Sequence, residues 1–173
     1  KPTSGEILFN GSSLKGKSRH RITKSGIART FQNVRLFGDM TALENVLTAT
    51  DVHNKSGLMG AMFTSPRSRR EESASRKKAQ EILEFIGIAN RSDQLARNLP
   101  YGDQRRLEIA RAMGTSPQLL LLDEPAAGFN PSEKKALGEL IVKIRNSGYT
   151  VLLIEHDMKL VMGICERIVV IDY

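Results

Sequence analysis

The second half of the chain contains three short runs in which apolar residues follow one another almost without interruption. They are Leu119–Leu122, Thr150–Ile154 and Arg167–Ile171. Runs of this length without polar alternation are typical of strands that are buried on both faces of a sheet. Between the first two runs, Asn130-Pro131 is a typical helix start and Ser147-Gly148 a typical helix stop. The alternation of strands with a helix predicts a parallel α/β sheet.

The middle of the chain has a helical pattern instead. Thr41–Glu44 forms a capping box, because the Thr41 hydroxyl and the Glu44 carboxylate can each accept a hydrogen bond from the exposed backbone N–H of the other residue. This box predicts a helix that runs to about Thr50. Residues 51–66 are rich in Gly, Ser, Asn and Met, which predicts a loop or short irregular helices. A second helix is expected to open at Ser65-Pro66 and to run to about Ile86.

Two further strands are predicted nearer the beginning of the chain. Glu6–Gly11 is expected to form a short strand that runs into a turn, in which Gly11 supplies a positive φ angle. Gly26–Phe31 is expected to form a second strand that ends at Gln32.

The segment after the first of these strands matches a phosphate-binding pattern. Gly11–Ser18 satisfies G-x-x-x-x-G-K-[ST] letter for letter. That pattern needs a substantial helix after it, so that the helix N-terminus faces the phosphates. Residues 19–26 offer one apolar side chain and no amphipathic stripe. We therefore interpret the match, including Lys17, as a coincidence in a basic surface loop.

Composition narrows the class of protein. Of the 173 residues, 40% are hydrophobic and 26% are charged, which is ordinary for one globular domain. Cys165 is the single cysteine, so an internal disulfide is excluded and a reducing cytosol fits. No apolar run approaches the ~18 residues that a bilayer span requires. A role at a membrane would therefore be carried out from the aqueous side.

The formal net charge of +7 suggests a nucleic-acid partner at first sight. The basic residues gather in two places, at residues 15–24 and 67–78. Neither group has the interleaved aromatic residues that stack on bases, and the second contains Glu71 and Glu72. We interpret both groups as solvated faces or as a surface near anionic lipid headgroups, and nucleic acid is the alternative.

Two acidic residues directly follow the run of leucines. Asp123 and Glu124 stand at the carboxyl end of the predicted strand Leu119–Leu122, where ligands bind in open α/β sheets. The first acid of such a pair can orient Mg²⁺, usually through its water shell, and the second can polarise a water for attack on a γ-phosphate. The alternative is a helix-capping acid pair in a loop, which the four adjacent leucines do not favour.

Three more features stand at the ends of predicted elements. Leu99–Arg106 is a tight glycine turn that opens a helix, and the exposed backbone N–H groups of such a turn favour an anion. His156 follows the predicted strand Thr150–Ile154 and can donate a hydrogen bond to a γ-phosphate, although a lone histidine in this position is usually structural. Gln32 ends its own strand and can ligate Mg²⁺ or the attacking water.

Taken together, these features resemble the ABC ATPase family, and their order and spacing match it along essentially the whole chain. Phe31-Gln32 resembles the Q-loop, Leu99–Gln104 the signature sequence, Leu119–Glu124 the Walker B strand with its catalytic glutamate, Ala126–Pro131 the D-loop and His156 the switch histidine. The segments around Gln32, Gly102, Asp123 and His156 also resemble the ATPase subunits of bacterial branched-chain amino acid importers, and so does the insertion at residues 51–66.

The resemblance implies roles for individual residues. The catalytic residues would be Glu124 as general base, His156 as sensor of the γ-phosphate, and Gln32; Asp123 and Gln32 would serve Mg²⁺. The residues that would contact ATP held by a second subunit are Pro100, Tyr101, Gly102, Asp103, Gln104 and Asn130. Pro100 stands where the family usually has a serine, so one hydroxyl contact to the γ-phosphate is lost. Tyr101 replaces a glycine, and Asn130 stands where many members have an aspartate.

The implied fold is a P-loop NTPase-like (ABC ATPase) α/β core with a parallel sheet and a helical subdomain. Residues 1–32 would form part of the core with its edge strands and Q-loop, and residues 33–99 the helical subdomain. Residues 100–173 would contain the signature helix, Walker B, D-loop and switch histidine. The true P-loop, its strand and its helix would lie upstream of Lys1, because residues 1–7 resemble the segment after that helix. The chain alone is then expected to be inactive.

The implied function is ATP hydrolysis that drives the import of branched-chain or other amino acids, with ATP and Mg²⁺ as ligands. Two ATPase subunits, identical or different, would dimerise head to tail on the cytoplasmic face of the inner membrane. Residues 33–99 would dock integral-membrane permease subunits, an extracytoplasmic solute-binding protein would take part indirectly, and no nucleic acid is expected. The alternatives are a non-transport ABC-class ATPase of the DNA-repair or chromosome type, and a non-catalytic binding or regulatory fragment.

Overall fold

The computed structural model describes residues 4–31, 34–50 and 66–171. Its strands are β1 Leu8–Phe9, β2 Ser12–Ser13, β3 Ile27–Arg29, β4 Leu119–Asp123 and β5 Thr150–Ile154. Its helices are α1 Arg19–Lys24, α2 Ala42–Thr50, α4 Pro66–Ile86, α5 Tyr101–Gly114, α6 Pro131–Asn146 and α7 Met158–Ile164, with 3₁₀ turns at Ala89–Arg91 and Ala96–Asn98. The predicted loop at residues 51–66 and the capping residue Ser65 lie outside the described residues, apart from Pro66 itself.

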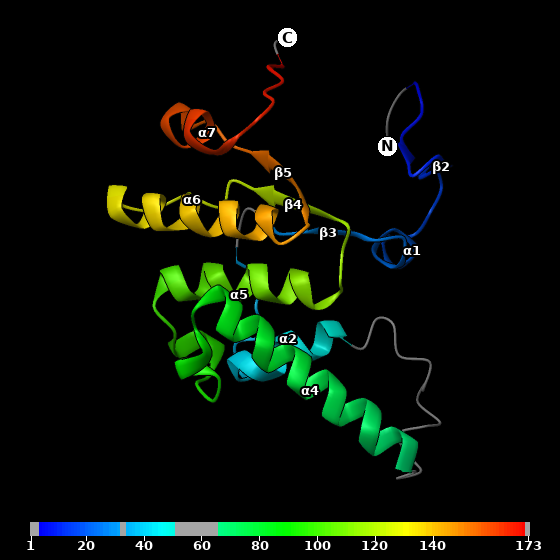
Figure 1. Cartoon of the computed structure of the whole chain (residues 1–173), viewed down its shortest axis with the longest axis vertical. Helices are drawn as coiled ribbons and strands as arrows, with labels where there is room; N and C mark the ends of the chain where they lie inside the picture. Colours follow the sequence, from blue (N-terminus) through cyan, green and yellow to red (C-terminus); the bar gives the residue numbers. More distant parts are fainter. Residues whose placement is uncertain (1–3, 32–33, 51–65, 172–173) are drawn as a thin grey trace.

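Strands β3, β4 and β5 form one parallel sheet in that order, which confirms the predicted α/β class (Figure 1). In the register, Leu120 lies opposite Ala28 of β3 and Val151 of β5. Because all the strands run the same way, their carboxyl ends meet at one edge, and Asp123 pairs with Ile154 there. We call this the carboxyl edge of the sheet.

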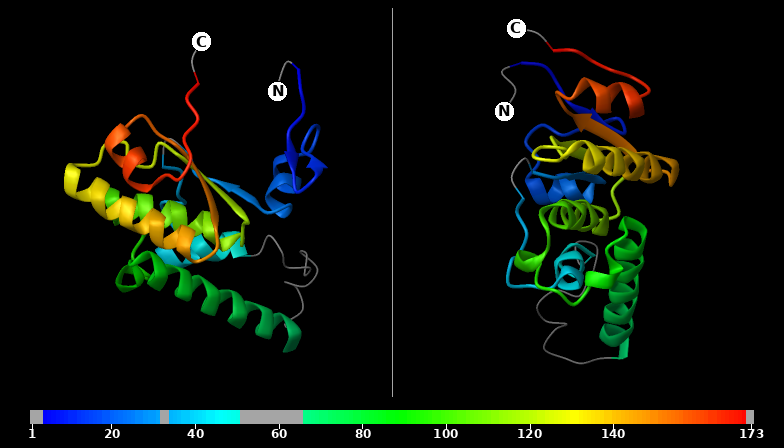
Figure 2. Two further views of the ribbon diagram at one scale, coloured as in Figure 1. Left: turned by 45° about the horizontal axis from the view of Figure 1, so that its top comes forward. Right: turned by 90° about the vertical axis from the view of Figure 1, so that its left-hand side faces the viewer.

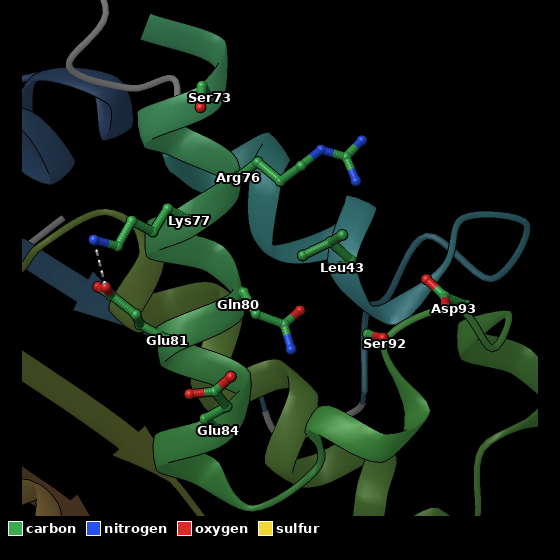
Figure 3. A pocket seen from close by; sticks show the side chains of 9 residues that line it. All are labelled: Leu43, Ser73, Arg76, Lys77, Gln80, Glu81, Glu84, Ser92 and Asp93. Atoms are coloured by element: carbon green, nitrogen blue, oxygen red, sulfur yellow. Dashed lines mark ion pairs between the residues drawn. The ribbon is translucent and has the colours of Figure 1, made fainter. Parts of the chain in front are cut away.

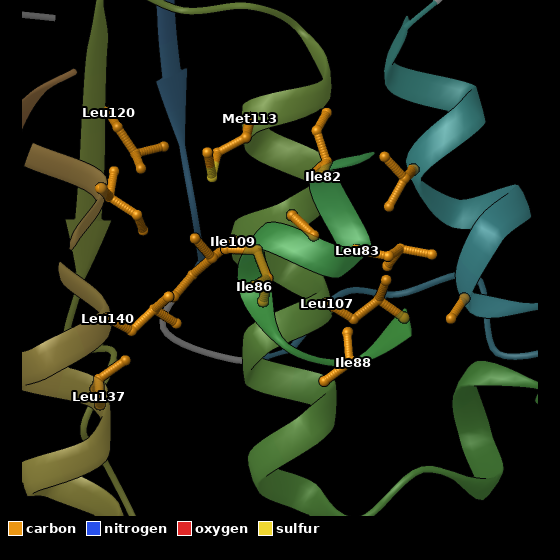
Figure 4. Close-up of a cluster of buried hydrophobic side chains, with 14 of the residues drawn as sticks. Ile82, Leu83, Ile86, Ile88, Leu107, Ile109, Met113, Leu120, Leu137 and Leu140 are labelled. Carbon is orange, nitrogen blue, oxygen red and sulfur yellow. The ribbon is translucent and has the colours of Figure 1, made fainter. Parts of the chain in front are cut away.

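The two faces of the parallel sheet are covered unequally. Leu120 and Leu122 are fully buried in the core, and Leu120 points towards Met113 of α5 (Figure 4). On the opposite face, Leu152 and Ile154 of β5 keep 49% and 48% of their surface exposed. The prediction that β5 is buried on both faces is therefore wrong, because the described elements cover this second face only in part.

The third predicted strand, Arg167–Ile171, has no regular secondary structure and no strand pairing in the described structure. Val169, Val170 and Ile171 are 78%, 82% and 92% exposed. A strand requires the backbone of a neighbour for its hydrogen bonds, and among the described residues no strand lies beside this segment. The prediction of a strand here is wrong for that reason, although the residues have the composition of one.

Helix α5 lies between two layers of the molecule (Figures 1 and 2). It packs against α2 and α4 on one side and reaches β3 and β4 on the other. Its Leu107 and Ile109 are buried in a cluster that includes Leu83 and Ile86 of α4 and Leu140 of α6 (Figure 4). The N-terminal turn of α5 therefore belongs to a helix that contacts both the helical layer and the sheet.

The helix ends follow from local sequence. The Thr41 N–H donates to Glu44 Oε2 at 2.8 Å and the Glu44 N–H donates to Thr41 Oγ1 at 3.2 Å, which confirms the predicted capping box. Asn130 and Glu133 form a second capping box at the start of α6. Helix α4 ends before Gly87, whose φ angle of +84° is a conformation that other residues rarely adopt.

The N-terminal segment differs from what the phosphate-binding pattern would need. β1 and β2 form a two-stranded antiparallel hairpin with Gly11 at φ +72°, and this hairpin is separate from the parallel sheet. Helix α1, which was not expected, has six residues, is capped by Ser18 and buries none of its side chains. Lys17 therefore stands before a short exposed helix, whereas a P-loop joins a strand of the central sheet to a long helix.

Candidate functional site

The carboxyl edge of the sheet brings together the residues that follow β4 and β5. The Glu124 N–H donates to the carbonyl of Ile154 at 2.9 Å, so the two segments stay paired one residue beyond β4. Asp123 and Ile154 are paired at the ends of β4 and β5, so Glu124 and His156, one and two residues beyond that pair, stand at the same edge of the sheet. The structure thus brings Asp123, Glu124 and His156 to one edge.

Glu124 has an unusual backbone. Its φ angle is +44°, in the left-handed region that non-glycine residues rarely occupy. The carbonyl of Glu124 accepts the Ala127 N–H at 3.2 Å, so the chain turns sharply directly after the acid pair. Strained backbone of this kind clusters at functional sites, where the surrounding structure holds it in place. At Glu124 the backbone therefore leaves the direction of strand β4.

Asp123 is held by a partner on the neighbouring strand. Arg29 Nη2 lies 2.6 Å from Asp123 Oδ2, and the Asp123 side chain is only 16% exposed. The Asp123 N–H donates to the Thr30 hydroxyl at 3.2 Å. Arg29 and Thr30, at the end of β3, therefore fix the carboxylate that the sequence assigned to Mg²⁺. Sequence reasoning missed Arg29, because its distance from Asp123 along the chain gives no local signal.

A metal ion at this edge would depend on few protein ligands. Among the residues that the structure describes, no group of three or more His, Cys, Asp or Glu side chains is arranged to hold a metal. Mg²⁺ commonly takes one or two carboxylates and completes its shell with water and phosphate oxygens. Asp123, at the end of a buried strand, fits such a site as a single carboxylate ligand. The described residues do not fit a site in which every ligand comes from the protein.

Glu155 joins the ends of β4 and β5, a function that the sequence analysis missed. Its carboxylate accepts the N–H of Ala126 at 2.9 Å and the N–H of His156 at 3.2 Å. His156 is exposed. The next residue, Asp157, caps α7 through the N–H groups of Lys159 and Leu160, so His156 lies between two acids that are both engaged with backbone. These neighbours hold the backbone on both sides of His156.

Asp157 also forms an ion pair. Lys134 Nζ of α6 lies 2.6 Å from Asp157 Oδ2. The hydrogen bond from Lys134 and the N–H groups of α7 hold the pKa of Asp157 below its ordinary value. The segment after β5 is therefore tied to α6 and carries an ionised carboxylate next to His156 at neutral pH.

The N-terminus of α5 contains five of the predicted nucleotide contacts. Pro100 stands at the cap position without a side-chain hydrogen bond, and Gln104 Nε2 donates back to the carbonyl of Leu99 at 2.9 Å. Asp103 is paired with Arg91 Nε at 2.7 Å. The Asp103 carboxylate and the Gln104 amide thus support the turn itself. What the turn offers to an anion is the set of N–H groups in its first residues, which have no partner within a helix.

Tyr101 links this turn to the predicted D-loop. Its hydroxyl donates to the carbonyl of Ala127 at 3.1 Å, and its ring meets Phe129 edge-on with centroids 5.9 Å apart. Gly128 has a φ angle of +80°, and a Cβ there would come within 3.4 Å of the Tyr101 ring. Asn130 accepts the Glu133 N–H at 2.9 Å, so its side chain caps α6 in this structure.

Arg105 and Glu108 form a buried ion pair on α5 that the sequence analysis did not single out. Arg105 Nη1 lies 3.3 Å from Glu108 Oε2, and the two side chains are 4% and 3% exposed. The N–H of Phe31 donates to Glu108 at 3.1 Å, and Arg105 donates to the carbonyl of Phe31 at 3.1 Å. Burial raises the pKa of Glu108, and the bonds from Phe31 and Arg105 oppose that rise. The sequence gives no local signal for this role, because Phe31 lies 74 residues before Arg105.

Gln32, which the sequence analysis assigned to catalysis and to Mg²⁺, lies outside the described residues. Two clefts lie in the described part of the molecule away from the carboxyl edge. One of about 690 Å³ is lined by α4, by Leu43 of α2 and by Ser92 and Asp93 (Figure 3). Another of about 730 Å³ lies between α6 and α7. Neither of these two clefts is lined by Asp123, Glu124 or His156.

Comparison with known proteins gives consistent relatives. The chain is 51% identical over 173 residues to the high-affinity branched-chain amino acid transport ATP-binding protein LivG of Escherichia coli K12, and the match covers 99% of this chain and 68% of LivG. It is 48% identical over 172 residues to BraF of Pseudomonas aeruginosa, a protein of the same description, with the same coverage.

Solved structures agree with this result. A nucleotide-free ATP-binding cassette from an ABC transporter superposes with a TM-score of 0.76 at 29% identity, covering 95% of this chain and 64% of that one. The dimeric post-hydrolysis cassette MJ0796, bound to ADP and phosphate, gives 0.71 at 26% identity, covering 92% and 66%. The chain thus spans about two thirds of the length of the proteins that it matches. The profile described as ABC transporter matches residues 1–127. The chain belongs to the ABC transporter family, as its motifs predicted.

Proposed function

We propose that this chain is the greater part of an ATP-hydrolysing subunit that drives import of branched-chain amino acids. The observation that carries the proposal is the carboxyl edge, where Asp123 and Glu124 follow one parallel strand and His156 follows the next. The choice of solute is supported by 51% identity to LivG, whose name states branched-chain amino acid transport.

In this proposal the residues at the edge divide the work of hydrolysis. Glu124 would orient and deprotonate the attacking water from the sharp turn at the end of β4, where its φ angle is +44°. His156 donates to the γ-phosphate from the end of β5, and Gln32 completes the catalytic set. Asp123 would hold Mg²⁺, with Gln32 as a second ligand. When bound, the ion neutralises charge that develops on the transferred phosphoryl group.

The N-terminal turn of α5 is proposed to bind the ATP of a second subunit. N–H groups of the first helical turn, together with the helix dipole, favour the negative charge of a phosphate. Pro100, Tyr101 and Gly102 would approach that phosphate from the opposite subunit, and Asn130 would lie beside them. A head-to-tail dimer would place each turn over the other subunit's site, and the dimeric structure of the cassette MJ0796 supports the pairing of two such subunits.

We further propose that a separate P-loop segment completes the sheet, and that the chain alone does not hydrolyse ATP. Leu152 and Ile154 form a half-exposed apolar face on a parallel sheet, a class of sheet that is normally covered on both faces. A strand and helix joined by a P-loop would cover this face and lie next to Asp123. Measurable Mg²⁺-dependent hydrolysis by the 173-residue chain that disappears in Lys17→Ala would contradict this part of the proposal.

Permease subunits are proposed to dock on the helical layer, on the cytoplasmic side of the membrane. Phe37 and Met40 are 50% and 38% exposed in a loop that the buried Asn45 holds through hydrogen bonds to Phe37, Met40 and Thr41. Such exposed apolar side chains on a fixed loop are suited to a protein interface. None of the helices in the described part is both long and apolar enough to cross a bilayer.

The proposal is tested in a chimera in which this chain replaces the matching part of Escherichia coli LivG, assembled in its transporter. Glu124→Gln is expected to lower ATP hydrolysis by about 100-fold or more, because a general base contributes that much, and to leave ATP binding intact. Glu139→Gln, an exposed acid on α6, is the matched control and should change neither quantity. Hydrolysis that is unchanged in Glu124→Gln would refute the assigned role.

A further inference from the structure

A continuous set of polar contacts joins the end of β3 to the loop after β4. It starts at Phe31, whose N–H and carbonyl are both bound by side chains of α5, namely Glu108 and Arg105. Arg105 Nε then donates to the Tyr101 hydroxyl at 3.0 Å. That hydroxyl donates onward to the carbonyl of Ala127 at 3.1 Å. Three segments that are far apart in sequence are joined in this way.

The contacts differ in their exposure to water, because Tyr101 is 45% exposed whereas the charged pair is not. The Arg105 and Glu108 side chains are almost fully buried, and a buried charge that loses its partner costs several kcal/mol. Arg105 has acceptors at Glu108, Phe31 and Tyr101, and its guanidinium also lies over the Tyr101 ring, 5.4 Å from the centroid. A shift of α5 relative to the end of β3 would therefore break charged hydrogen bonds, whereas an apolar contact could slide.

Tyr101 gives the set its second connection. The phenol acts as acceptor for Arg105 and as donor to Ala127, so one oxygen is shared by α5 and the loop after Glu124. The ring also packs on Phe129 and against Gly128. A phenylalanine at position 101 would keep the ring contacts and lose both hydrogen bonds, which separates the polar link from the packing.

We infer that Tyr101, Arg105 and Glu108 are positioning residues that make the N-terminal turn of α5, the end of β3 and the Ala127 loop move as one unit. The inference deepens the proposed function, because it makes contact at the α5 turn reposition the loop that follows the general base. Arg105 and Glu108 need not touch the water or the γ-phosphate, and Tyr101 would approach the phosphate through its backbone N–H while its hydroxyl stays bound to Ala127. Their effect is on the rate of hydrolysis through the placement of neighbouring backbone.

The first test uses the 173-residue chain and needs no nucleotide. Amide exchange at Phe31, measured by NMR, is expected to be about fivefold faster in Tyr101→Phe, since one hydrogen bond of about 1 kcal/mol is withdrawn from Arg105. The Thr30 amide, which donates to Leu121 within the sheet, should not change. Tyr149→Phe removes a phenol elsewhere and is the matched control. Unchanged exchange at Phe31, or faster exchange at Phe31 and Thr30 alike, would overturn the inference.

The second test measures ATP hydrolysis in the LivG chimera. Tyr101→Phe is expected to lower kcat about fivefold and to leave the KM for ATP within twofold of the parent. Glu108→Gln should lower kcat as well, and the double variant should lose much less than the product of the two losses, because both act through Arg105. Losses that multiply, or a kcat unchanged in Tyr101→Phe, would contradict the inference.

The two tests separate this inference from the proposed function. If the unsubstituted chimera hydrolyses ATP and Tyr101→Phe equals it, the positioning role fails and the function stands. If the unsubstituted chimera is inactive, the function fails, and amide exchange at Phe31 still decides whether the three segments are coupled.

Discussion

Asn45 offers a strong test of how the loop that presents Phe37 and Met40 is stabilised. Its side chain is fully buried on α2. Its Oδ1 accepts the Phe37 N–H at 2.9 Å, and its Nδ2 donates to the carbonyls of Phe37 at 3.0 Å and Thr41 at 2.9 Å, with a longer contact to Met40. One amide therefore replaces the backbone partners that this loop lacks.

The cost of Asn45→Ala follows from these contacts. Three well-formed hydrogen bonds at about 1 kcal/mol each give about 3 kcal/mol. Half-exposed Phe37 indicates that water can reach some of the groups left behind, so we expect about 2–3 kcal/mol. For a chain of this size the same loss lowers Tm by about 5–10 °C.

Equilibrium urea unfolding followed by circular dichroism measures the free energy of unfolding directly. The matched control is Asn98→Ala, because Asn98 is exposed in a 3₁₀ turn and should change stability by less than about 0.5 kcal/mol. A value for Asn45→Ala within 0.5 kcal/mol of the parent would refute the reasoning. Such a result would show that water replaces the amide without cost.

Two further predictions concern carboxylates. Glu108→Ala is expected to lower the free energy of unfolding by about 3–5 kcal/mol, because it leaves Arg105 charged and buried without its acid; urea unfolding measures this, and a loss below 1 kcal/mol would contradict it. The N–H and the hydroxyl of Thr41 lower the pKa of Glu44, so the unfolded chain takes up the proton first as the pH falls. That stabilisation is present above the unfolded pKa and is lost as pH falls through the folded pKa. Between about pH 5 and pH 3, the free energy of unfolding of Glu44→Gln should therefore fall less than that of the parent. Equal slopes of the free energy of unfolding against pH in the two proteins would contradict this.

Local sequence was sufficient wherever local physics decides structure. The Thr41 capping box and the helix start at Asn130 are recognisable in the sequence because each pairs residues three positions apart. The leucine run of β4 predicts its buried position, since a parallel strand in the middle of a sheet has neighbours on both sides. The acid pair and His156 share one edge because parallel strands end together.

The errors came from features that depend on distant partners. Leu152 and Val170 lie in apolar segments that look like buried strands, but both residues are exposed. Their own segments do not show which other element covers them or pairs with them. Helix α7 is the exception, since its cap at Asp157 is local and was missed. Arg105 and Glu108 look like a solvated pair on a helix, and only the fold shows that Phe31 lies against them.

The central claim is that the α5 turn and the carboxyl edge meet one triphosphate from two subunits, and photolabelling tests it most directly. The LivG chimera would be irradiated with an ATP analogue that carries a photoreactive group on its γ-phosphate, with and without excess ATP. We predict ATP-protected labelling of two peptides, one containing Gly102 and the other His156. Labelling confined to other segments, or labelling of these two that excess ATP does not suppress, would contradict the account.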